Sequence, residues 1–140
     1  MQVNIYVESN IKGAKAKNGI GMYILEAEID GQVYTKTEKI TMSDVSRNAL
    51  ELLVLKKALQ RMTKSSEIRI FTCNDTIYGT FQNGWNLVWA DTGWTNKKGD
   101  KVKNWEQWKD ITELLENHTF EITRESHSYR TWMQNNLKEE

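Results

Sequence analysis

Three acidic residues that lie far apart in the sequence are the first candidates for chemistry, Glu8, Glu51 and Asp75. Glu8 ends one alternating, strand-like stretch and Asp75 follows another, so both are expected at strand ends. If those strands are neighbours, Glu8 and Asp75 meet at one end of a sheet. Carboxylate oxygens are the ligands that Mg²⁺ prefers. Two such ions, about 3.5–4 Å apart, can activate water and stabilise the leaving oxygen in phosphodiester hydrolysis.

Glu51 is the sharpest of these observations. Helical spacing places it on the same face as Leu55, Ala58 and Met62. Burying an ionised carboxylate costs several kcal/mol unless it is paired or bound to a metal. We expect no basic residue of this helix on that face, which favours a bound cation. The alternative is that Glu51 lies at the edge of the apolar stripe and reaches water, and that Glu8 and Asp75 are ordinary polar residues beside turns.

The elements that position these residues can be predicted from periodicity. Alternation predicts strands over 2–8, 19–29, 33–40, 67–73 and 119–123, with a hairpin turn at Asp30-Gly31. Steps of three and four predict helices over 45–62, 75–81, from 85 onward, 103–116 and 130–138. Ser43 or Ser46 is the expected cap of the first helix. The order predicts an α/β fold, a mixed sheet flanked by helices, with ligands beyond the carboxyl ends of its strands.

Composition sets the broad class. The 140 residues indicate one domain over 1–140, and 39% hydrophobic with 27% charged residues is typical of a soluble globular protein. Nineteen basic and nineteen acidic residues cancel, so any nucleic-acid binding must rest on local patches. The single cysteine, Cys73, allows no internal disulfide, and the N-terminus lacks an early apolar run. We therefore expect a cytoplasmic protein. No stretch is long and apolar enough to cross a bilayer.

Several segments resemble the type 1 ribonuclease H family. Residues 5–10 (IYVESN) stand where the family has an I-Y-T-D-G-S-like segment, and residues 48–59 match its N-R-x-E-L helix without a gap. Residues 75–78 (DTIY) resemble D-S-x-Y, and residues 102–108 (VKNWEQW) resemble V-K-N-x-x-L-W. The resemblance spans nearly the whole chain.

The resemblance implies a fold, an activity and a ligand set. The fold would be ribonuclease H-like, with a five-stranded sheet of three antiparallel strands followed by parallel strands. The activity would be hydrolysis of the RNA strand of RNA–DNA hybrids by two-metal-ion catalysis with Mg²⁺ or Mn²⁺. The family's four acidic ligands map to Glu8, Glu51, Asp75 and Asn135. Glu8 replaces an aspartate, and Asn135 replaces an acid and lacks its charge.

The family's mobile histidine loop maps to residues 124–128 and is about two residues shorter here. His127 would then assist proton transfer or product release. Without the resemblance, a histidine beside serine and tyrosine is most often a surface residue.

Substrate contacts follow from the same resemblance. Asn10, Asn48, Thr76 and Asn104 match positions that contact the hybrid in the family. Lys97 and Lys98 belong to a lysine-rich turn that resembles its basic protrusion, although the same turn in a generic protein is simply solvated.

The expected partner is an RNA–DNA hybrid, bound by a monomer through phosphate and 2′-hydroxyl contacts. Two alternatives stay open, a binding module of weakened or absent activity, and a related nuclease acting on DNA junctions or single strands. Trp85 and Trp89 share one helix face, and we expect both to pack in the core rather than stack on bases.

Overall fold

The computed structural model describes residues 1–138 and contains one mixed sheet. The sheet order is β3-β2-β1-β4-β5, with antiparallel pairing among β1, β2 and β3 and parallel pairing of β1 with β4 and of β4 with β5. The strands are β1 (Gln2–Ser9), β2 (Lys15–Ile29), β3 (Gln32–Ser46), β4 (Glu67–Thr72) and β5 (Thr119–Thr123). The predicted fold class and strand arrangement are confirmed.

Five helices complete residues 1–138, in the predicted order. They are α1 (Arg47–Gln60), α2 (Asp75–Gln82), α3 (Trp85–Asp91), α4 (Trp105–Leu115) and α5 (Arg130–Asn136). Ser46, and not Ser43, caps α1, because its hydroxyl accepts a hydrogen bond from the Ala49 amide at 3.0 Å. Across residues 1–138, no helix has both the length and the apolar character that a bilayer span requires.

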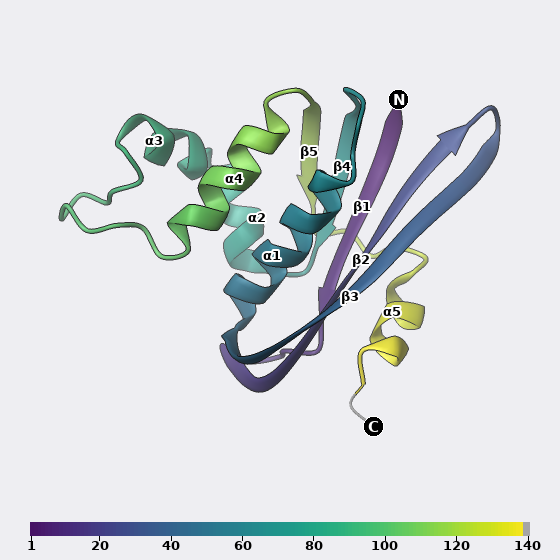
Figure 1. Ribbon diagram of the computed structural model, residues 1–140, viewed down its shortest axis with the longest axis horizontal. Coiled ribbons are helices and arrows are strands. Elements are labelled where there is room, and N and C mark those ends of the chain that lie inside the picture. Colours follow the sequence, from purple (N-terminus) through teal and green to yellow (C-terminus); the bar gives the residue numbers. More distant parts are fainter. Residues whose placement is uncertain (139–140) are drawn as a thin grey trace.

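The sheet separates two apolar cores, because successive side chains of a strand point to opposite faces. Ile5 and Val7 of β1 pack on one face with α1 and α4, whereas Tyr6 packs on the other with Met133 and Leu137. Figure 1 shows α1 and α4 side by side over the sheet, with α5 set apart from them. The β1 carboxyl end, where Glu8 lies, is therefore flanked by α1 on one face and α5 on the other.

Strands β2 and β3 are longer than predicted. They pair from Lys15↔Ser46 to Ile29↔Gln32 and form a long two-stranded ribbon (Figure 1). Most of β3 is exposed, so its residues show little apolar alternation from which a sequence prediction could place its ends.

Helix α1 approaches β2 closely at Gly21. A Cβ atom at this position would lie 2.5 Å from Cγ2 of Val54, well inside van der Waals contact. Glycine is required here because the backbone of β2 packs directly against the helix that carries Glu51.

Replacing Gly21 with alanine should overpack this contact and lower the free energy of unfolding by about 1–3 kcal/mol. Urea denaturation followed by circular dichroism would measure the change. Gly13→Ala is the matched control, since nothing lies within 4 Å of a Cβ at Gly13. Equal midpoints for the two variants would contradict the close approach of α1 to β2.

Candidate active site

A cleft lies at the carboxyl end of β1. Parallel pairing of β1 with β4 sets Val7 beside Thr72, so the next residues, Glu8 and Cys73, are neighbours at the ends of the two strands. The cleft has a volume of about 1030 Å³ and is lined by Glu8, Glu51 and Cys73 among others. It is the place where a mixed sheet of this kind is expected to bind its ligand.

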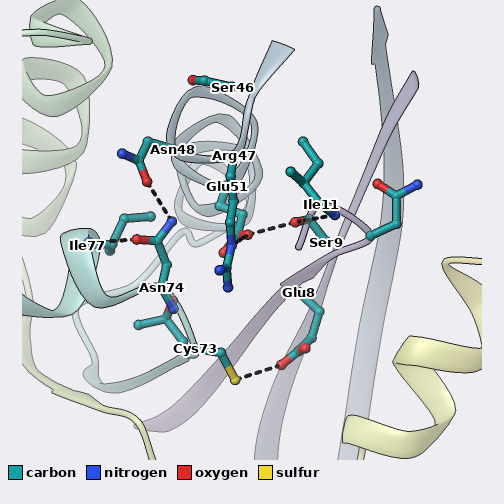
Figure 2. Close-up of polar contacts among 12 residues, drawn as sticks. Glu8, Ser9, Ile11, Ser46, Arg47, Asn48, Glu51, Cys73, Asn74 and Ile77 are labelled. Carbon is teal, nitrogen blue, oxygen red and sulfur yellow. Dashed lines mark hydrogen bonds and ion pairs between the residues drawn. The ribbon is translucent and has the colours of Figure 1, made fainter. Parts of the chain in front are cut away.

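Glu51 projects into this cleft from α1 and is buried, with 1% of its surface exposed. Its Oε2 accepts hydrogen bonds from Ser9 Oγ and from Arg47 Nε, both at 2.7 Å (Figure 2). The prediction that no basic residue of the helix shares its face is wrong, because Arg47 stands one turn before it, at the spacing i,i+4. Burial raises the pKa of Glu51, and the charge of Glu8 adds to that rise, while Ser9 and Arg47 oppose it.

Glu8 is also buried and is held by three side chains from distant parts of the chain. Gln134 Nε2 donates to its Oε1 at 2.6 Å. His127 Nε2 lies 3.4 Å from its Oε2, and the Cys73 thiol lies 3.9 Å from the same atom. The carboxylate is therefore oriented from both α5 and the end of β4.

His127 lies beside Glu8, and its side chain is only 5% exposed. Its ring packs on Tyr6, with the ring centroids 4.4 Å apart, and meets Phe71 edge-on. The following Tyr129 donates a hydrogen bond to Glu26 on β2 and ties the loop to the sheet. The placement of His127 beside Glu8 agrees with the expected site, and the catalytic role of His127 stays a prediction.

Asp75 does not group with the two glutamates within residues 1–138, and its role as a ligand stays a prediction. Its side chain is 82% exposed and pairs with Arg124 at 2.9 Å, and it does not line the cleft. The reason is local. Asn74 caps α2 by accepting from the Ile77 amide at 3.0 Å, so Asp75 is the first helical residue, and its exposed carboxylate pairs with Arg124. Cys73 takes the place beside Glu8.

Asn135 also lies elsewhere. It is exposed and lines a separate groove with Asn18 and Lys39, whereas the preceding residue, Gln134, faces Glu8. Consecutive helical residues point about 100° apart, so a shift of one position in an alignment moves the side chain to a different face. Gln134, and not Asn135, is the α5 residue that contacts Glu8.

The sequence profile of the family described as RNase H matches residues 1–130. The chain belongs to the ribonuclease H family. A protein named Ribonuclease H from Legionella pneumophila (strain Corby) is 27% identical over 118 residues, which cover 84% of this chain and 78% of that protein.

Solved structures show the same fold. LC9-RNase H1, described as a type 1 RNase H with the type 2 active-site motif, has a TM-score of 0.74 and 17% identity, over 97% of this chain and 69% of that one. LC11-RNase H1, solved in complex with an RNA/DNA hybrid, has a TM-score of 0.59 and 13% identity, over 96% of this chain and 92% of that one. The expected family, fold and enzyme class, ribonuclease H, are confirmed.

The predicted substrate residues of this ribonuclease H are dispersed. Asn10 lines the cleft, and its side-chain oxygen accepts from the Ile20 amide at 2.8 Å. Asn48 accepts from Asn74 at 2.9 Å, just outside the cleft lining (Figure 2). Thr76 is exposed on α2. The remaining three, Lys97, Lys98 and Asn104, lie on the long connection between α3 and α4.

The two tryptophans of α3 differ. Trp89 packs against the core, but Trp85 is exposed, so the prediction that both are core residues is wrong for Trp85.

Four residues that contact Glu8 or Glu51 were not predicted from the sequence. Arg47 could have been found from its i,i+4 spacing to Glu51, and Ser9 from its position after Glu8. Cys73 and Gln134 carried no signal, because a thiol and an amide are not the ligands that the family resemblance implies.

The ribonuclease H family is generally dependent on divalent metal ions, and the donor set of the cleft fits this requirement in part. Glu8 and Glu51 supply carboxylate oxygens, which Mg²⁺ binds together with several waters. Within residues 1–138, no three His, Cys, Asp or Glu side chains are grouped closely enough to hold a metal. Glu8 and Glu51 are therefore the residues that would hold a cation, and the ligands inferred at Asp75 and Asn135 are absent from the cleft.

The raised pKa of Glu51 predicts a pH-dependent effect on stability in EDTA. The Glu51 carboxyl group holds its proton more tightly in the folded protein than in the unfolded chain. Ionisation of Glu51 therefore lowers the free energy of unfolding, in full once the pH exceeds the pKa of the folded state. This loss of stability disappears as the pH falls to 4.5, the ordinary pKa of a glutamate. Glu51→Gln should therefore unfold at higher urea concentration than the wild type at pH 7, with the difference narrowing toward pH 4.5.

Glu113→Gln is the control for this measurement, because Glu113 forms an exposed pair with Lys109 on α4. Its stability should stay within about 0.5 kcal/mol of the wild type. A Glu51→Gln protein that is less stable than the wild type at pH 7 would show that the bonds from Ser9 and Arg47 outweigh burial.

Proposed function

We propose that this ribonuclease H hydrolyses the RNA strand of RNA–DNA hybrids at the Glu8–Glu51 cleft, with Mg²⁺ or Mn²⁺ as cofactor. The observation that carries the proposal is the pair of buried carboxylates at the carboxyl end of β1. Burying two acids in one cleft costs several kcal/mol each unless partners or a bound metal compensate the charge, so the pair is unusual for a purely structural cleft. The two acids fit a cation-binding role.

Basic side chains around the cleft support a nucleic-acid substrate. They are Lys12, Lys17, Arg47, Arg130 and Lys138. Such side chains bind phosphates and give a salt-dependent affinity that does not depend on sequence. The neutral net charge of the chain is thus compatible with a local basic rim.

The side chains around the acids have definable tasks. Glu8 and Glu51 would hold a divalent cation, which would supply a more acidic water and stabilise negative charge on the phosphodiester. Ser9 and Arg47 fix the orientation of Glu51. Gln134 holds one oxygen of Glu8, and His127 Nε2 lies beside the other, close enough to exchange a proton with a group bound there.

A second candidate is a hybrid-binding module that does not cleave. The pairing of Asp75 with Arg124 favours it, because it removes one expected acid from the cleft. The neutral Gln134 beside Glu8 favours it too. A cytoplasmic monomer remains part of our proposal, and the single cysteine, Cys73, is compatible with a reducing compartment.

Cleavage of a labelled RNA–DNA hybrid by the purified chain would test the proposal. We expect cuts in the RNA strand with Mg²⁺ or Mn²⁺ and none in EDTA. Glu8→Gln should slow cleavage by at least about 100-fold, since even outer-shell changes at metal sites cost up to that factor. Single-stranded DNA and duplex DNA in the same assay distinguish the related nuclease activities. Retention of the hybrid without cleavage would leave only the binding module.

A pair of substitutions on α5 tests which residue belongs to the cleft. Gln134→Glu adds a carboxylate next to Glu8 and should strengthen Mg²⁺ binding by about tenfold, because opposite charges attract strongly at such short range. Asn135→Asp adds the same charge on the neighbouring face and should have little effect. Isothermal titration with MgCl₂ would measure both affinities. A gain from Asn135→Asp alone would mean that our placement of α5 is wrong.

A further inference from the structure

Arg47 stands in an unusual electrostatic position. It is the first residue of α1, where the amide dipoles of the helix favour negative charge, and no acidic residue lies in that first turn. Its Nε instead lies 2.7 Å from Glu51, and its side chain is 28% exposed and lines the cleft. The guanidinium is thus held by the acid rather than by the helix end.

The partner of Arg47 is one of the two acids that would bind metal. Glu51 is almost fully buried, so its charge must be balanced within the cleft. Arg47 provides that balance and, with Ser9, occupies Oε2. A cation that binds this oxygen has to replace the guanidinium, because two positive charges at such short range repel each other.

We propose that Arg47 is a built-in counter-ion for Glu51, and that a divalent cation must displace it to bind there. Arg47 is then a positioning residue that keeps Glu51 in place and weakens metal binding in the free protein. The inference rests on the proposed function, since it takes the Glu8–Glu51 cleft as the metal site. It also explains why the charge of Glu51 is balanced within the cleft by a side chain of the same helix, Arg47.

Titration of the full chain with Mn²⁺ in the absence of nucleic acid tests this inference, with free Mn²⁺ followed by electron paramagnetic resonance. Arg47→Gln removes the charge and should bind Mn²⁺ at least about tenfold more tightly than the wild type. Arg47→Lys keeps the charge and should resemble the wild type. Lys56→Gln is the matched control on α1, because Lys56 pairs with Asp110 away from the cleft.

Two further measurements locate the effect. In Arg47→Gln combined with Glu51→Gln, the gain in affinity should disappear. If the Arg47→Gln protein is too unstable in EDTA for a titration, its melting temperature is measured with and without Mn²⁺ instead. The rise on adding Mn²⁺ should then be larger than the rise of the wild type. Equal or weaker Mn²⁺ binding by Arg47→Gln, or a gain that persists without Glu51, would overturn the inference. Because no hybrid is present, failure of cleavage by the wild type is a separate result that bears on the proposed function alone.

Discussion

The arrangement of this protein depends on keeping two carboxylates out of water in one cleft. Glu8 and Glu51 come from different elements, β1 and α1, and each is almost fully buried. Buried charges persist only when neighbouring groups compensate them, and here the compensation is divided. Ser9 and Arg47 donate hydrogen bonds to Glu51, whereas Gln134 donates to Glu8 and His127 lies beside it.

The sheet topology makes this division possible. Glu8 and Ser9 are the last two residues of β1, and the parallel strand β4 brings Cys73 beside Glu8. Helix α1 then lies on one face of the sheet and α5 on the other, so each acid is approached from its own side. The cleft is thus a product of the order of the strands rather than of any single loop.

The sequence predicts much of this design through periodicity. The element order, the sheet class and the positions of Glu8 and Glu51 follow from alternation, helical spacing and the family resemblance. The directions of side chains at helix ends do not follow. Asp75 is the exposed first residue of α2, which Asn74 caps, and Asn135 faces away because one helical step separates it from Gln134. These outcomes depend on single-residue offsets that a sequence pattern leaves open.

The attachment of α5 to the sheet links the two groups that hold Glu8. Met133 and Leu137 are buried against the sheet, and Tyr129 is bonded to Glu26 just before the helix begins. His127 precedes this anchor and Gln134 follows it, so both depend on how α5 is seated. A tilt of α5 would alter both contacts to Glu8 together. The tilt of α5 on the sheet therefore controls both the width of the cleft and the position of the Glu8 carboxylate.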